Sequence, residues 1–276
     1  MDRRRKSIKE LSVSIIQMLV EKNKKNNLKK AKKLIEKSLK DKPDIIILPE
    51  MFNCPYDISY FSDFSEKEEG ETWTFLSQIA KKNDTYIIGG SIPEKHNHKI
   101  YNTSYIFDKQ GKQIGKYRKT HLFDIDVENG QYFCESDVLS PGNYTEIVSI
   151  EGIDVGILIC YDIRFPEISR KLAINGAKLI VVPAAFNMTT GPLHWELLFR
   201  ARALDNQIFL IAVSQARNYS SNYISYGNSL ICDPWGKVIQ RLSEKEGILS
   251  CKINLSEINK VRNQIPVLKH LRTNLY

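Results

Sequence analysis

The stretch that most restricts the fold covers residues 153–166 and joins an apolar run to a turn and a helix start. Its first seven residues, 153–159, are mostly apolar and β-branched, and they are too few to cross a membrane. Such a run is typical of a strand buried on both faces of a sheet. Phe165-Pro166-Glu167 then begins a helical pattern, with proline and an acid in its first turn. The pattern predicts an α/β fold class, with Cys160 at the carboxyl end of a buried strand.

Cys160 therefore stands at the position where open α/β sheets collect ligands. The N-terminus of a following helix also favours an anion such as a thiolate. An inert buried cysteine is the alternative, because free cysteine is among the most buried residue types. Partner residues elsewhere in the chain have to decide between the two interpretations.

The rest of the chain alternates apolar runs with amphipathic segments, which predicts layers of helices and strands. The predicted helices cover residues 23–40, 71–82, 165–173, 193–206 and 255–264. The predicted strands cover residues 12–18, 44–48, 86–89, 100–107, 113–116, 144–150, 153–159, 178–182, 208–213, 228–233, 237–241 and 248–253. No repeat or linker divides them, so we expect a single domain over residues 1–276, in which residues 1–9 form a flexible basic tail.

The net charge of +8 is concentrated near the N-terminus. Residues 1–42 carry a net charge of +10, and the remainder carries −2. A nucleic-acid-binding function would depend on that segment alone. Between residues 27 and 39, however, apolar residues recur at helical spacing, so the lysines fit the solvated face of a helix equally well. We therefore expect no nucleic-acid partner.

The five cysteines are an odd number without paired spacing, which indicates neither a disulfide framework nor a zinc site. They favour the reducing cytoplasm, and the pattern assigns no role to Cys54 or Cys134. No apolar run approaches the roughly 18 residues of a transmembrane helix, so we expect no membrane partner. His96-Asn97-His98 lacks a third ligand. We expect neither a metal nor a cofactor.

Two charged residues occupy positions from which they can meet Cys160. Glu50 ends the predicted strand 44–48 as Cys160 ends its own, so both should emerge at the same sheet edge. Lys119 follows another predicted strand and begins a polar, irregular segment that extends to residue 142. A thiol that hydrolyses an amide or nitrile needs a base for its proton and a cation or donor for the oxyanion. A surface glutamate and a surface lysine are the alternatives.

Three separated motifs carry a resemblance to a known family. They are Leu48-Pro49-Glu50, Tyr117-Arg118-Lys119-Thr120-His121-Leu122-Phe123-Asp124 and Cys160-Tyr161-Asp162-Ile163-Arg164-Phe165-Pro166-Glu167. In this order they resemble the glutamate, lysine and cysteine motifs of the nitrilase (carbon–nitrogen hydrolase) superfamily. The similarity extends over residues 11–276. Segments 89–94, 121–127, 185–196 and 264–276 look most like the omega-amidase branch.

The resemblance implies a four-layer αββα sandwich that forms a homodimer and hydrolyses a small-molecule amide through a thioester. It implies that Cys160 is the nucleophile, Glu50 the general base and Lys119 the cation at the oxyanion. The backbone N–H of Tyr161 would be a second oxyanion donor. Glu135 matches an additional active-site glutamate that positions the lysine and the hydrolytic water. We also expect the nearby lysine to favour the thiolate over the thiol.

The omega-amidase branch further implies a substrate, namely the terminal amide of 2-oxoglutaramate or 2-oxosuccinamate. Arg164 offers a planar fork for the distal carboxylate, and a structural salt bridge is the alternative. Phe186 and Thr190 would complete the pocket, with a core aromatic and a turn hydroxyl as alternatives. Tyr56 would line the entrance. The same triad acting on deaminated glutathione, an N-carbamoyl amine or a nitrile is the alternative function.

Overall fold

Two β-sheets form the centre of the molecule. The computed structural model describes residues 10–275. The first sheet has seven strands in the order β15-β1-β2-β3-β5-β4, with β6 paired to β5. They are β1 (Glu10–Gln17), β2 (Ile45–Ile47), β3 (Tyr86–Ile88), β4 (Ile92–His96), β5 (Lys99–Phe107), β6 (Gln113–Arg118) and β15 (Gly247–Asn254). Because β1, β2 and β3 are parallel, their carboxyl ends meet at one edge of this sheet.

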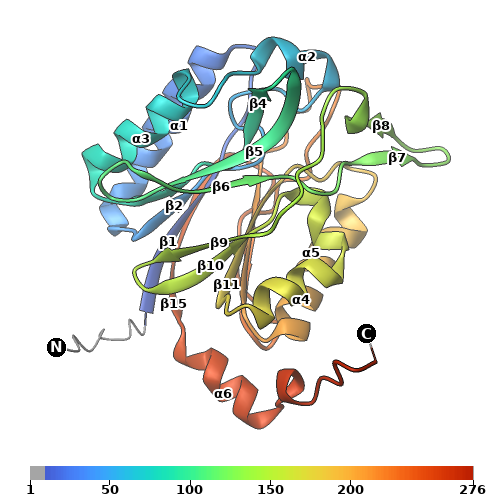
Figure 1. The fold of residues 1–276 in the computed structure, drawn as a ribbon. Coiled ribbons are helices and arrows are strands. Elements are labelled where there is room, and N and C mark those ends of the chain that lie inside the picture. Colours follow the sequence, from blue (N-terminus) through green and yellow to red (C-terminus); the bar gives the residue numbers. More distant parts are fainter. Residues whose placement is uncertain (1–9, 276) are drawn as a thin grey trace.

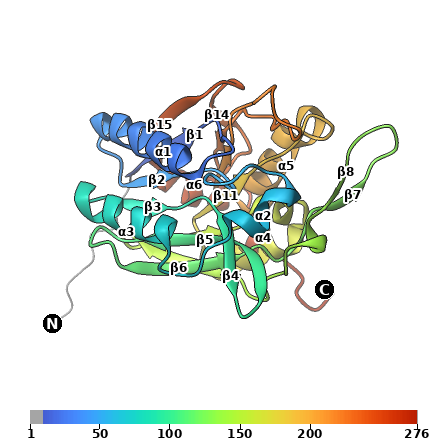
Figure 2. The same cartoon turned by 90° about the horizontal axis from the view of Figure 1, so that it is seen from above.

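The second sheet has six strands in the order β14-β13-β12-β11-β10-β9. They are β9 (Glu146–Ile150), β10 (Ile153–Ile157), β11 (Leu179–Ala184), β12 (Phe209–Ser214), β13 (Leu230–Cys232) and β14 (Val238–Arg241). Here β10, β11 and β12 are the parallel strands. A separate hairpin of β7 (Asp124–Asp126) and β8 (Tyr132–Cys134) extends away from the body of the molecule (Figures 1 and 2).

Helices cover the outer face of each sheet (Figures 1 and 2). The first sheet carries α1 (Lys24–Ser38) and α3 (Glu71–Asn83), and the second carries α4 (Pro166–Ile174) and α5 (Gly191–Asn206). The remaining α-helices are α2 (Ile58–Phe64) and α6 (Ser256–Gln264). Short 3₁₀ helices are η1 (Leu39–Asp41), η2 (Glu135–Asp137), η3 (Cys160–Arg164) and η4 (Val267–Lys269).

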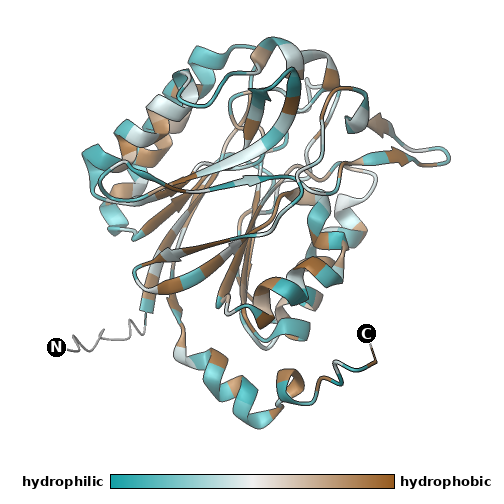
Figure 3. Ribbon diagram, viewed as in Figure 1, coloured by the Kyte–Doolittle hydropathy of each residue, from teal (hydrophilic) through white to brown (hydrophobic). Residues whose placement is uncertain are grey.

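The apolar residues of these elements form separate clusters between the layers of a sandwich. One core cluster joins the facing sides of the two sheets, for example Val13 and Ile47 of the first with Val155 and Ile211 of the second. Another joins the outer side of the first sheet to α1 and α3. In Figure 3 brown, hydrophobic residues gather on the central strands of the sheets and on the helix faces that pack against them. The predicted four-layer αββα arrangement is confirmed.

Local sequence explains most of the element boundaries. Asn23 caps α1 by accepting a hydrogen bond from the backbone N–H of Asn26 at 3.0 Å, and the buried residues of α1 recur at helical spacing. Pro166 opens α4, as its fixed φ allows at a first helical position. Left-handed residues end several helices, such as Asp84 with φ 48° after α3.

The structure adds elements that the sequence did not predict. Helix α2 and strand β4 lie in segments without a clear period, and the segment 117–142 contains the β7–β8 hairpin. Between β10 and α4 the chain first forms η3, so Cys160 precedes the α-helix by a full 3₁₀ segment. The predicted flexible tail, residues 1–9, lies outside the described residues. Within residues 10–275, no helix is both long enough and apolar enough to cross a membrane.

Candidate active site

Glu50 is placed by a tight turn after β2. Met51, the next residue, has φ 49°. Gly90 packs against this turn with φ 57°, and a Cβ there would lie 2.1 Å from the carbonyl oxygen of Pro49, so only glycine fits. From the other sheet, Gln215 donates through Nε2 to the carbonyl oxygen of Glu50 at 2.8 Å. Both sheets therefore fix the turn, and the Glu50 side chain is fully buried.

Cys160 is placed by a strained backbone at the start of η3. Its φ of 47° lies in the left-handed region, which costs a non-glycine residue about 1–2 kcal/mol. The backbone of Ala185, just after β11, lowers the pKa of the thiol, although burial raises it. The side chain is only 3% exposed. Strain of this kind persists where the surrounding structure holds a residue in place, and it is frequent at functional sites.

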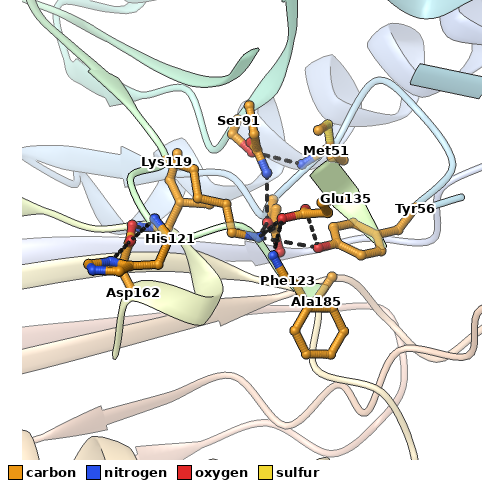
Figure 4. A network of polar contacts seen from close by, with 12 residues as sticks. Met51, Tyr56, Ser91, Lys119, His121, Phe123, Glu135, Asp162 and Ala185 are labelled. Carbon is orange, nitrogen blue, oxygen red and sulfur yellow. Dashed lines mark hydrogen bonds and ion pairs between the residues drawn. The ribbon is translucent and has the colours of Figure 1, made fainter. Parts of the chain in front are cut away.

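Lys119 follows β6 directly and points into the same buried region. Its backbone N–H donates to the carbonyl of Asn102 at 2.9 Å, and its carbonyl accepts from the N–H of Gly142 at 2.8 Å. Its Nζ donates to Glu50 Oε1 at 3.0 Å and lies 2.8 Å from Glu135 Oε2. All three side chains have no exposed surface (Figure 4). The structure thus brings Glu50, Lys119 and Glu135 into one cluster.

Glu135 is held from two sides at the base of the β7–β8 hairpin. Its Oε2 accepts the backbone N–H of Phe123 at 2.7 Å, and its Oε1 accepts the hydroxyl of Tyr56 at 2.7 Å (Figure 4). The same hydroxyl lies 3.3 Å from Lys119 Nζ. Tyr56 is 2% exposed, because its ring packs in an aromatic cluster and its hydroxyl meets a buried carboxylate. It therefore lies in the interior of the site, and its part in substrate binding stays a prediction.

The Glu50 carboxylate has one engaged oxygen and one open oxygen. Oε1 accepts from Asn102 Nδ2 at 2.8 Å as well as from Lys119. Oε2 is buried without a hydrogen-bond partner among residues 10–275. Asn102 was not predicted, because it lies inside β5 and belongs to none of the three motifs. The open oxygen is the one available to receive a proton.

Burial sets the protonation states of this cluster. It raises the pKa of Glu50 to about 7, against the lowering effect of Lys119. Burial by itself would lower the pKa of Lys119, but the Glu135 and Glu50 carboxylates raise it, so the ammonium persists. Burial and then the Glu50 charge raise the pKa of the Cys160 thiol, and Lys119 offsets only part of this. Lys119 therefore favours the thiolate, as predicted, but burial and the Glu50 charge have the larger and opposite effect on the pKa.

Arg164 ends η3, four residues after Cys160. Its guanidinium is 5.0 Å from the ring centroid of Phe186, and its Nη1 lies 3.2 Å from His194 Nδ1. Burial lowers the pKa of Arg164, although a guanidinium stays charged at neutral pH. Among residues 10–275 no carboxylate pairs with it, and its buried Nε has no partner. The alternative of a structural salt bridge is therefore not observed.

Phe186 and Thr190 differ in what their side chains can offer. Phe186 packs on Trp195, with ring centroids 5.1 Å apart, so it is a core aromatic that also contacts Arg164. Thr190 donates its hydroxyl to Asn187 Oδ1 at 3.0 Å, as the alternative of a turn hydroxyl expects. A part in substrate binding stays a prediction for both.

Tyr223 belongs to the site and was not predicted. Its ring centroid lies 4.6 Å from that of Tyr56, and its hydroxyl donates to the carbonyl of Ala185. It lies between β12 and β13 in a segment without a motif, so the sequence carried no signal for it. Cys54 is buried in the same aromatic cluster, and Cys134 is half-buried at the base of the hairpin. Within residues 10–275, no group of three or more histidine, cysteine or acidic side chains is arranged to hold a metal ion.

The αββα fold and the buried glutamate–lysine–cysteine region define a class of hydrolase, and comparison with known proteins agrees. The family model described as carbon-nitrogen hydrolase matches residues 12–263. The chain belongs to this family and is an enzyme that hydrolyses carbon–nitrogen bonds. The predicted resemblance is thereby confirmed.

The similar proteins include two named omega-amidases and one solved structure from the nitrilase superfamily. The chain is 46% identical to omega-amidase NIT2-A of Xenopus laevis over 264 residues, which cover 96% of each chain. It is 44% identical to omega-amidase NIT2 of Mus musculus with the same coverage. The crystal structure of Saccharomyces cerevisiae Nit3, described as a member of branch 10 of the nitrilase superfamily, matches with a TM-score of 0.88 at 37% identity. That match covers 96% of this chain and 97% of Nit3.

Proposed function

We propose that this enzyme is an omega-amidase, which hydrolyses the terminal amide of 2-oxoglutaramate or 2-oxosuccinamate to the acid and ammonia. The observation that carries this proposal is the buried Lys119 ammonium between Glu50 and Glu135, next to a cysteine and an arginine without a carboxylate partner among the described residues. The relatives named omega-amidases support the substrate class.

The proposed first half-reaction forms a thioester. Glu50 takes the proton of the Cys160 thiol while the sulfur attacks the amide carbonyl. The oxyanion of the tetrahedral intermediate is stabilised by the Lys119 ammonium and by the backbone N–H of Tyr161. Glu50 then returns the proton to the nitrogen as the carbon–nitrogen bond breaks, so ammonia leaves and the acyl group remains on the sulfur.

The proposed second half-reaction releases the acid. Glu50, again a carboxylate, takes a proton from a water that attacks the thioester carbonyl. Glu135 holds Lys119 in place throughout, because it contacts the same ammonium that Glu50 contacts. Collapse of the second intermediate breaks the carbon–sulfur bond and returns the proton to the sulfur.

The function is tested with a panel of substrates assayed for ammonia release. We expect 2-oxoglutaramate and 2-oxosuccinamate to be hydrolysed with higher kcat/KM than deaminated glutathione, an N-carbamoyl amine or a nitrile. Higher kcat/KM on one of the latter would assign the same triad to that substrate instead.

Arg164 should recognise the carboxylate of the substrate. We expect Arg164→Gln to lower kcat/KM for 2-oxoglutaramate by about 10–100-fold, because a charge-assisted hydrogen bond contributes about 1.5–3 kcal/mol. The control substrate is pentanamide, which lacks the carboxylate. For this substrate we expect Arg164→Gln to lower kcat/KM less than about threefold. An equal loss on both substrates would show that Arg164 supports the site rather than binding a carboxylate.

The dependence of kcat/KM on pH below neutrality should follow the ionisation of Glu50. Its pKa of about 7 means that the carboxylate, which is the form that accepts the thiol proton, predominates only above neutrality. We therefore expect kcat/KM to rise with pH through about 7 and to fall about tenfold per unit well below it. Initial rates between pH 5 and 8.5 would measure this, and a profile that is flat across that range contradicts Glu50 as the base.

We further propose a homodimer in a reducing, cytoplasmic compartment. Leu193, Leu197 and Leu204 of α5 are 74%, 66% and 50% exposed, and together they give this helix an apolar outer face that a second copy would cover. All five cysteines are free thiols, as a reducing compartment allows. Sedimentation should give twice the chain mass, and Leu197→Glu should shift it toward the monomer.

A further inference from the structure

One buried carboxylate outside the proposed triad links the two chain segments that carry the lysine and the cysteine. Asp162 comes two residues after Cys160 and has no exposed surface. Its two oxygens contact five polar groups at 2.8–3.0 Å. These are Tyr117 Oη, Thr120 Oγ1, His121 N, His121 Nδ1 and Ile159 N. A buried carboxylate needs hydrogen-bond partners of this kind. Here all the partners also lie in the two chain segments next to Lys119 and Cys160.

On the cysteine side, Asp162 closes the turn that presents the thiol. Its Oδ2 accepts the backbone N–H of Ile159 at 3.0 Å, and its own N–H donates to the Ile159 carbonyl at 3.1 Å. Cys160 lies between them with φ 47°. The reciprocal pair of hydrogen bonds is therefore positioned to hold the strained conformation of the nucleophile.

On the lysine side, Asp162 contacts the residues that flank Lys119. Tyr117 Oη donates to Oδ2 at 2.8 Å, and Thr120 Oγ1 donates to Oδ1 at 2.9 Å. The backbone N–H of His121 donates to the same Oδ1 at 2.9 Å. Figure 4 shows Asp162 and His121 on one side of Lys119, with Glu135 and Tyr56 on the other.

We infer that Asp162 is a positioning residue that sets the distance between the Cys160 sulfur and the Lys119 ammonium. Its contacts go to the neighbours of the two reacting groups, so it acts through them and is not itself a catalytic residue. The inference rests on the proposed glutamate–lysine–cysteine chemistry and adds a determinant of its geometry. A displacement of about 1 Å between such groups can cost about 100-fold in rate.

The experiment replaces Asp162 with asparagine, which keeps the size of the side chain and removes one acceptor oxygen. We expect kcat for 2-oxoglutaramate to fall about 100-fold while KM changes less than about threefold, since the pocket around Arg164 is untouched. Alkylation of Cys160 by iodoacetamide at pH 7, followed by peptide mass spectrometry, should slow about tenfold. This second measurement needs no turnover, so it tests the inference even if the proposed substrate is wrong.

A double-mutant cycle separates positioning from a general loss of stability. Tyr117→Phe alone should lower kcat about fivefold by removing one hydrogen bond to Asp162, and it should lower kcat no further in the Asp162→Asn background. If Asp162→Asn does not fold, Tyr117→Phe and Thr120→Val test the inference instead. Each should lower kcat about fivefold.

Gln17→Leu is the matched control. Gln17 is also fully buried and makes four hydrogen bonds, which join β1 to residues Ser229, Ser243 and Lys245. The substitution should lower the free energy of unfolding but leave kcat and the rate of Cys160 alkylation within twofold of the wild-type values. The inference is overturned if folded Asp162→Asn keeps both rates, if KM rises at constant kcat, or if Gln17→Leu loses as much activity.

Discussion

Replacing Cys160 with alanine is expected to abolish ammonia release while the protein keeps its fold. The sulfur is the only atom of the protein that bonds to the substrate carbonyl in the proposed mechanism, so we expect a loss of at least about 10³-fold in kcat. The cost in stability should be about 1 kcal/mol, because only one buried atom is removed and alanine tolerates the positive φ about as well as cysteine does. Steady-state assays and circular dichroism measure the two effects.

A second buried thiol provides the control for this variant. Cys232 is fully buried in β13 of the same sheet, and Cys232→Ala should lose a similar amount of stability with unchanged turnover. Intact-protein mass spectrometry with substrate should show an acyl adduct on the wild type and none on Cys160→Ala. Residual turnover above a tenth of the wild-type rate would identify a different nucleophile.

Replacing Lys119 with methionine is expected to damage both activity and stability. The side chain keeps its length, but Glu50 and Glu135 lose the one cation between them, and breaking a buried ion pair costs about 3–5 kcal/mol. Without the ammonium the pKa of Glu50 rises further, so less of the base is ionised at pH 7. With the loss of oxyanion stabilisation, we expect kcat to fall by more than about 10³-fold.

Urea unfolding and ammonia release measure these losses separately. Lys82→Met is the matched substitution, because Lys82 pairs with Glu36 at the surface, where an ion pair contributes at most about 1 kcal/mol. It should change neither stability nor turnover appreciably. Turnover of Lys119→Met within tenfold of the wild type would show that the ammonium does not stabilise the transition state.

The apolar periods of the sequence predicted the layers well, because the buried strands and amphipathic helices are long and regular. They also placed Glu50 and Cys160 after the ends of buried strands, but β2 and β10 belong to two different sheets and not to one sheet edge as predicted. The residues that the sequence did not reveal depend on contacts across the fold: Asn102 reaches Glu50 from the middle of β5, and Tyr223 comes from a segment without a motif. The positive φ of Cys160 was equally hidden, since no local signal marks a strained residue that is not glycine.

The net direction of the Cys160 pKa shift was hidden for a related reason. Sequence reasoning counts charges near the sulfur, and Lys119 does lower the pKa of Cys160. The degree of burial, which has the larger and opposite effect, depends on packing that emerges only in three dimensions. The burial of Tyr56 was hidden for the same reason, because it follows from rings contributed by distant segments.

The composition of the charged cluster has a consequence for where hydrogen ions reside during turnover. Two acidic side chains share one ammonium there, so full ionisation would leave uncompensated negative charge in the interior of the protein. A hydrogen on Glu50 relieves that imbalance below its pKa of about 7, and above it the carboxylate is free to accept one. On the proposed mechanism, the hydrogen that leaves with ammonia comes from the Cys160 thiol, and the water that enters for deacylation supplies its replacement.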